Sequence, residues 1–65
     1  MITVNGKKIN NADNLKLSDF LKREGYNTSM IAVECNKSII PKIKYGEKKL
    51  EDGDSLEVVS FVGGG

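Results

Sequence analysis

The sequence predicts a small α+β domain, in which one mixed β-sheet is covered on one face by a single helix. Short runs of alternating apolar and polar residues, typical of strands, occur near both ends of the chain and in its middle. A single segment has apolar residues at helical spacing, and 65 residues leave room for one domain. A sheet packed against one helix is the simplest layered arrangement that buries the apolar faces of both.

The first two strands are predicted on either side of Asn5-Gly6. Residues 1–4 alternate in polarity, and residues 7–10 form the returning strand. Asn-Gly favours a tight hairpin turn, because both central positions of such a turn need a positive φ. A polar loop over residues 10–14 then leads away from the hairpin.

The helix is predicted over residues 17–25. Its apolar residues share one face at helical spacing and are expected to be buried: Leu17, Phe20 and Leu21. Ser18 is the expected N-cap, because a serine hydroxyl can accept a hydrogen bond from an unpaired N–H of the first turn. Gly25 is expected to end the helix, because glycine adopts the left-handed conformation easily.

Three more strands are predicted in the second half of the chain. They are residues 31–36, 38–40 and 55–62, separated by a turn at 36–37 and by an irregular basic segment and a second turn over 41–54. The last strand can pair only with earlier ones, and a compact sheet places it in the middle, parallel to the first. That arrangement is the β-grasp, or ubiquitin-like, sheet. We therefore expect a β-grasp domain over residues 1–62 and a flexible glycine tail over residues 63–65.

The composition argues against several classes of function. The chain has no histidine and one cysteine, so it can form neither a Ser-His nor a Cys-His catalytic pair, and we expect no metal site. The net charge of +1 gives no basic excess for binding nucleic acid. We therefore expect that the chain is not an enzyme. Since no segment is apolar enough to span a membrane and no leader is apparent, we expect a cytoplasmic protein.

The C-terminal glycines allow two interpretations. A glycine-rich stretch is most often a flexible linker. Alternatively, if Gly65 is the C-terminal residue, its carboxylate could enter a narrow tunnel in another protein, because Gly63 and Gly64 carry no side chains that would block it. A phosphate-binding glycine loop is excluded, because such a loop needs a helix after it.

The last predicted strand suggests a docking surface beside this tail. If Leu56 and Val58 face the helix, alternation leaves Val59 and Phe61 on the open face, where an apolar pair would suit contact with a partner. Val62 ends the strand next to them and is included in this predicted surface. The alternative is that Phe61 packs on its own sheet or on residues 42–49.

Cys35 is expected to be a core residue and not a sulfur carrier. Its place in the alternation of residues 31–36 puts it on the same face as Ile31 and Val33. A buried cysteine behaves as a small, inert apolar residue.

The chain as a whole resembles the ThiS family of small sulfur-carrier proteins of thiamine biosynthesis. The resemblance rests on the order of these segments: Val4-Asn5-Gly6, Leu17-Ser18-Asp19-Phe20-Leu21, Ala32-Val33-Glu34-Cys35-Asn36, Ile39-Ile40-Pro41-Lys42, Asp52-Gly53-Asp54 and Val58-Val59-Ser60-Phe61-Val62-Gly63-Gly64-Gly65. At Lys42 the family often has arginine; lysine keeps the charge but cannot form the bidentate contacts of a guanidinium.

The resemblance implies a function, a reactive residue and a set of partners. A ThiF-like adenylating enzyme would use ATP and magnesium to adenylate the Gly65 carboxylate, so that the carrier itself holds no permanent cofactor. A sulfur donor such as a cysteine desulfurase would then convert it to a thiocarboxylate. A ThiG-like thiazole synthase would take the sulfur for the thiazole ring. Gly64 matches the other residue of the family's terminal Gly-Gly, and Gly63 is an extra glycine.

Three other functions remain open from the sequence. The small subunit of molybdopterin synthase shares the fold and the chemistry, but it tends to be longer and to carry a proline before Gly-Gly. A ubiquitin-like modifier would join its C-terminus to lysines, but ubiquitin has arginine before its glycines where this chain has apolar residues. A plain interaction domain with a disordered tail would be unaffected by an extension past Gly65.

Overall fold

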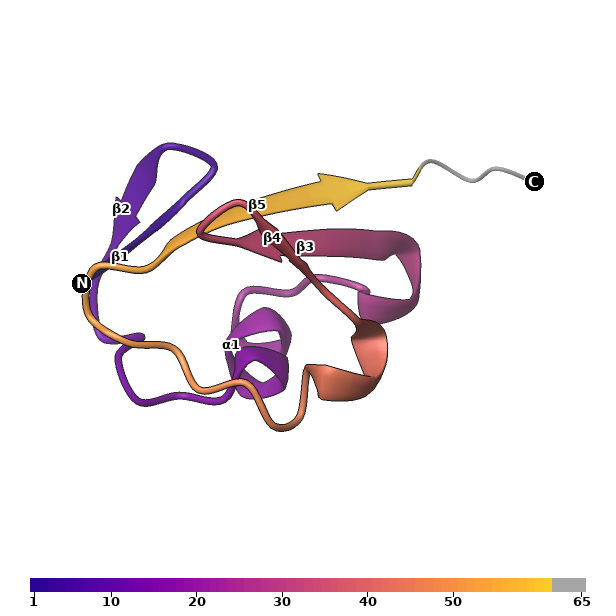
Figure 1. Cartoon of the computed structure of the whole chain (residues 1–65), viewed down its shortest axis with the longest axis horizontal. Helices are drawn as coiled ribbons and strands as arrows, with labels where there is room; N and C mark the ends of the chain where they lie inside the picture. The colour runs from indigo at the N-terminus through magenta and orange to yellow at the C-terminus, as the bar shows by residue number, and fades with distance from the viewer. Residues whose placement is uncertain (62–65) are drawn as a thin grey trace.

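The computed structural model describes residues 1–61 as a mixed five-stranded sheet with one helix against one face (Figure 1). The elements are β1 (Ile2–Val4), β2 (Lys7–Ile9), α1 (Leu17–Arg23), the 3₁₀ helix η1 (Thr28–Met30), β3 (Ile31–Cys35), β4 (Ser38–Ile40), the 3₁₀ helix η2 (Lys42–Lys44) and β5 (Ser55–Ser60). The strand order is β2-β1-β5-β3-β4. The predicted α+β class and β-grasp arrangement are confirmed.

The last strand lies in the middle of the sheet, as predicted. β5 pairs in parallel with β1, where Thr3 is opposite Ser55. On its other side β5 runs antiparallel to β3 over five residue pairs, from Cys35 opposite Leu56 to Ile31 opposite Ser60. β3 therefore flanks β5 to its end at Ser60, whereas β1 flanks only its first two residues.

Two tight turns with positive φ connect the outer strands, β2 and β4, to their neighbours. Asn5 and Gly6 have φ values of 51° and 82° and join β1 to β2, as the sequence predicts. Asn36 and Lys37, with φ values of 51° and 72°, join β3 to β4. Asparagine tolerates the left-handed conformation better than most residues, which explains why both turns begin with it.

The predicted first residue of α1 is confirmed, but the predicted N-cap, Ser18, is wrong. The helix begins at Leu17, and Lys16 is its N-cap residue without any side-chain capping bond. Backbone carbonyls of the later segment replace a side-chain cap: the N–H of Leu17 donates to Lys48 at 2.7 Å, and the N–H of Ser18 donates to Tyr45 at 2.9 Å. A tertiary contact thus satisfies the first-turn donors that a cap would otherwise serve.

The end of α1 agrees with the prediction. Glu24 is the C-cap residue, and Gly25 follows it with a φ of 82°. The N–H of Gly25 donates to Lys22, and the next N–H, from Tyr26, donates to Leu21 at 3.0 Å. A left-handed glycine at this position pairs carbonyls of the last turn that would otherwise be unpaired.

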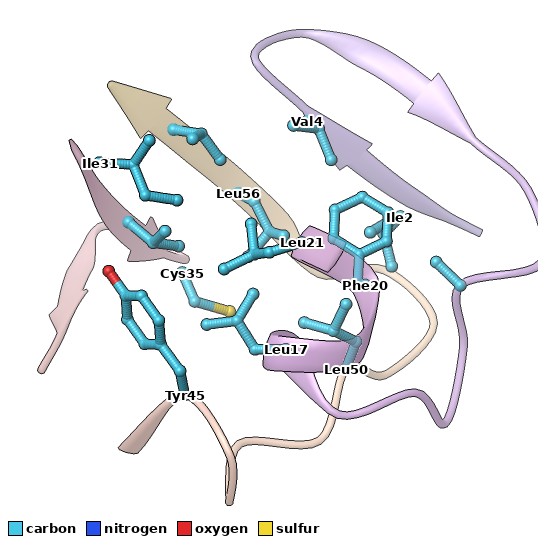
Figure 2. Packing of buried hydrophobic residues seen from close by; sticks show 13 residues of the cluster. Ile2, Val4, Leu17, Phe20, Leu21, Ile31, Cys35, Tyr45, Leu50 and Leu56 are labelled. Atoms are coloured by element: carbon cyan, nitrogen blue, oxygen red, sulfur yellow. The ribbon is translucent and has the colours of Figure 1, made fainter. Parts of the chain in front are cut away.

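The hydrophobic core lies between α1 and the sheet. Figure 2 shows Leu21 of the helix directed toward Leu56 of β5, while Phe20 lies beside Ile2 of β1. The buried apolar residues are Ile2, Val4, Ala12, Leu17, Phe20, Leu21, Ile31, Val33, Cys35, Tyr45, Leu50, Leu56 and Val58. All three predicted helix residues and all three predicted residues of β3 belong to this core.

The segment between β4 and β5 closes the open side of the core. The sequence predicts it as irregular and basic, yet it contains η2 and buries Tyr45 and Leu50. The carbonyl of Leu50 accepts from the N–H of Asn14 at 2.8 Å, and its N–H donates to Leu15 at 2.8 Å. This strand-like pairing fastens the segment beside the helix (Figure 1).

Candidate functional site

The two faces of β5 differ in the way that the alternation predicts. Leu56 and Val58 are buried against the helix layer, with exposed fractions of 0% and 8%. Val59 and Phe61 are 57% and 54% exposed. The open-face placement of this apolar pair is therefore confirmed, whereas its role in docking stays a prediction.

The open face also carries an isoleucine and two carboxylates. Glu34 of β3 lies opposite Glu57 of β5 in the strand register, and on its other side it lies opposite Ile39 of β4. Ile39 is 74% exposed. We call Ile39, Val59 and Phe61 the open-face residues. Like charges directly opposite each other disfavour the free sheet slightly, so a cationic group of a partner would be stabilising there.

Two asparagines hold β5 through their side chains. Asn36 accepts at Oδ1 from the N–H of Ser55 at 3.0 Å, and its Nδ2 donates to Oδ1 of Asp54 at 3.1 Å. Asn5 makes a similar pair of bonds with the backbone of Val58, at 2.8 and 3.1 Å. The sequence marks these asparagines as turn residues but does not reveal these contacts, because their partners are 18 to 53 residues away in the chain.

Asp54 fixes the start of β5. Its side chain is buried and accepts twice: Oδ1 from Asn36 at 3.1 Å, and Oδ2 from the N–H of Glu51 at 2.9 Å. A carboxylate that bonds its own turn in this way stabilises the turn before a strand. The turn predicted over residues 51–54 is present, with Gly53 at a φ of 93°.

Lys42 contacts the backbone of the protein itself. Its Nζ donates to the carbonyl oxygen of Ser29 at 3.1 Å and so links η2 to η1. The neighbouring Lys44 lies 3.9 Å from Glu47, at the long end of ion-pair distances. A single hydrogen bond to a carbonyl needs no guanidinium fork, so lysine is sufficient for this contact.

Cys35 is a core residue, as predicted. It is 4% exposed, and Figure 2 shows its sulfur directed toward Leu17 and away from the ring of Tyr45. Burial raises the pKa of the Cys35 thiol, and the nearby Asp54 carboxylate adds to the rise. The thiolate, which is the reactive form, is therefore disfavoured in the folded state.

We expect the Cys35 thiol to resist alkylation. At pH 8, iodoacetamide should modify the folded chain about 100-fold more slowly than the chain in denaturant, because reaction requires opening of the core. The folded-state pKa of the Cys35 thiol is raised, so this group contributes fully to the free energy of unfolding below its unfolded-state pKa. That contribution is lost as the pH rises through the folded-state pKa. Equal alkylation rates in the two states would show that the thiol is accessible.

No group of three or more histidine, cysteine, aspartate or glutamate side chains within residues 1–61 is placed to hold a metal ion. No helix in this range is long and apolar enough to cross a membrane. The candidate site consists of the end of β5, the open-face residues beside it and, in the sequence, the tail that follows.

The family profile of ThiS matches residues 1–65. The chain belongs to the ThiS family. The sulfur carrier protein ThiS of Bacillus subtilis is 39% identical over 66 residues, with 100% of both chains covered. The crystal structure of the thiamine biosynthesis protein ThiS from Geobacter metallireducens superposes with a TM-score of 0.79 at 28% identity, and the match covers 98% of this chain and 97% of that one.

A second kind of relative carries the ThiS-family sequence within a longer chain. A protein of Paramagnetospirillum magneticum named thiazole synthase is 36% identical over 64 residues. The match covers 98% of this chain but only 20% of that protein. A protein of the same name from Magnetococcus marinus shows the same proportions.

The predicted site residues fall into two groups. The structure describes Val59 and Phe61, which are both exposed and lie at the end of β5 and directly after it. Val62 and the tail residues Gly63, Gly64 and Gly65 lie outside the described residues. The sequence reasoning missed two residues next to this site, Asn5 and Ile39, and also the contacts of Asn36 at the start of β5. For Ile39 the strand alternation was a usable signal, once the face of β4 was assigned.

Proposed function

We propose that this chain is a sulfur carrier of thiamine biosynthesis that holds its sulfur at the carboxyl carbon of Gly65. The observation that carries this proposal is the family match, which extends through the terminal glycines to residue 65. Full-length similarity to the Bacillus subtilis sulfur carrier supports it. The fold adds support, because the central strand β5 leads directly to Phe61 and the glycine tail, beside the exposed Val59.

The proposed chemistry begins with activation of the carboxylate. At neutral pH the carboxylate of Gly65 is ionised and is a poor electrophile. A ThiF-like adenylating enzyme would transfer AMP from ATP to it, with release of pyrophosphate and with magnesium bound by that enzyme. The terminal sulfur of a persulfide formed by a cysteine desulfurase would attack the acyl carbon and displace AMP. A thiol reductant would then cleave the S–S bond of the resulting acyl disulfide. The product is a thiocarboxylate, so the carrier acts as a co-substrate and not as a catalyst.

The tail and the open face have separate tasks in this proposal. Gly63 and Gly64 would pass through a narrow channel of the adenylating enzyme, because glycine has no Cβ and accepts unusual backbone angles. The exposed side chains of Val59 and Phe61, with Val62, would dock on the surface around that channel. Apolar residues at the centre of an interface with charged residues at its rim are typical of protein recognition. The pair Glu34 and Glu57 would form such a rim and select a basic partner surface.

The proposed acceptor of the sulfur is a thiazole synthase. In the two thiazole synthases that resemble this chain, the similar sequence makes up 20% of each protein. A carrier and an acceptor in one polypeptide have a high effective concentration. This supports the proposal that the separate carrier also works next to a thiazole synthase.

Intact-mass measurement tests the proposal directly. The chain is incubated with a ThiF-like enzyme, ATP, magnesium, a cysteine desulfurase, cysteine and a thiol reductant such as dithiothreitol, and it should gain the mass difference between sulfur and oxygen. A chain extended by one residue past Gly65 is the control and should gain nothing. Absence of the gain with a competent enzyme, or the same gain in the extended chain, would contradict a thiocarboxylate at Gly65. Transfer of the sulfur to a thiazole synthase, and not to molybdopterin synthase, would then identify the pathway.

A further inference from the structure

The side-chain amide of Asn5 continues the pairing of β5 at the point where β1 ends. Its Nδ2 donates to the carbonyl oxygen of Val58 at 3.1 Å, and its Oδ1 accepts from the N–H of Val58 at 2.8 Å. Both bonds are partly buried and join residues that are 53 positions apart. The amide thus satisfies the two backbone groups of a single residue in the central strand.

The ladder between β1 and β5 shows why this position needs a side chain. The N–H of Thr3 donates to Asp54 at 2.9 Å, and the N–H of Asn5 donates to Leu56 at 2.9 Å. In a parallel pair, backbone groups face a given neighbour at every second residue, so the next residue to face β1 is Val58. By then the chain has turned away toward β2. A side-chain amide has the donor and the acceptor of a peptide group, and here it takes the place of one.

The Asn5 side chain therefore makes the last of these hydrogen bonds on the side of β5 that faces β1. On the other side, pairing with β3 continues to the end of the strand, where the N–H of Phe61 donates to the carbonyl of Met30 at 2.7 Å. Loss of the Asn5 amide would leave the segment from Val58 to Phe61 fastened along β3 alone. A segment held on one side frays more easily than one held on both.

We propose that Asn5 is a positioning residue, which fixes the direction of Val58 to Phe61 so that Phe61 meets a partner enzyme in the orientation from which the following tail can enter its active site. The inference rests on the proposed function, because it assumes that the tail enters a partner's active site. Reaction rates depend steeply on such alignment, and a small displacement of the reacting atom lowers them strongly. Asn5 acts through the strand and touches no reacting atom.

The second turn offers a matched control. Asn36 has the same φ of 51° as Asn5, and its side chain also makes two hydrogen bonds to the β5 region. Those bonds reach Asp54 and Ser55, at the opposite end of the strand from the tail. Glycine accepts a positive φ without strain, so Asn5→Gly and Asn36→Gly each remove one side-chain clamp and leave the turn possible.

Amide hydrogen exchange tests the clamp without any partner. Asn5→Gly should speed exchange at the Val58 amide about tenfold relative to core amides of the same variant, because a hydrogen bond of ordinary strength is lost. Asn36→Gly should speed exchange at Ser55 and leave Val58 unchanged relative to the core. Unchanged exchange at Val58 in Asn5→Gly would overturn the clamp.

Thiocarboxylate formation by a ThiF-like enzyme tests the positioning. At saturating carrier, Asn5→Gly should lower kcat about fivefold or more, whereas Asn36→Gly should change it less than about twofold. A role in stability alone would lower both variants in proportion to their loss of stability, and that result would overturn the inference while the proposed function stood. A wild-type chain that gains no sulfur would instead overturn the proposed function.

Discussion

Replacing Phe61 by aspartate is expected to lower kcat/KM for adenylation by a ThiF-like enzyme about 100-fold, because a charge would replace a central apolar contact of the docking surface. The Phe61 side chain is 54% exposed in the free chain, so the same change should alter the free energy of unfolding by less than about 1 kcal/mol. Pyrophosphate exchange would measure the first effect, and urea unfolding the second.

Ile43→Asp is the matched control for this variant. Ile43 is 81% exposed and apolar, but it lies on η2 and outside the sheet. The control should lower kcat/KM less than about threefold if docking is confined to the open face, since isolated surface substitutions have small effects. Equal losses in the two variants would mean that added negative charge in general, and not loss of the Phe61 contact, weakens the reaction.

Replacing Phe20 by alanine is expected to destabilise the fold by about 3–5 kcal/mol. The Phe20 side chain is 0% exposed, and the guanidinium carbon of Arg23 lies 5.4 Å from the centre of its ring. A domain of this size has a total stability of roughly 3–10 kcal/mol, so the loss is a large fraction of the total and the variant should unfold at a much lower temperature. Thermal unfolding followed by circular dichroism would measure the loss.

Phe61→Ala provides the comparison, because Phe20 and Phe61 are the two phenylalanines of the chain. The exposed Phe61 should lose less than about 1 kcal/mol of stability on the same truncation. A cooperative, near-wild-type transition in Phe20→Ala would contradict the core shown in Figure 2. A large loss of stability in Phe20→Ala and a small one in Phe61→Ala would distinguish the residue that supports the fold from the residue expected to contact a partner.

Much of the fold could be predicted because its signals are local. Asn5-Gly6 determines a hairpin by its own backbone preferences, and Gly25 ends the helix for the same reason. Alternation assigns Val33 to the core and Val59 to the open face without knowledge of any neighbour. The central position of β5 needed one further step, namely that a last strand must pair with earlier ones.

The candidate site was predicted less completely. The placement of Phe61 on the open face could be predicted because it follows from strand alternation, whereas its role in docking stays a prediction. The contact of Asn5 with Val58 was not found, because a turn asparagine looks the same whether or not its amide reaches a distant strand. The N-cap of α1 was wrongly predicted for a related reason, since carbonyls of residues 45 and 48 replace the expected serine cap.

The sequence by itself determined the order of helix and strands, the turns between them and the residues that alternate into the core. These properties depend on backbone preferences and on spacing within a few residues. Only the tertiary structure decided that Tyr45 and Leu50 close the core and that side-chain amides hold the central strand. Such contacts join segments far apart in the chain, and their energies depend on distances that appear only after the chain has folded.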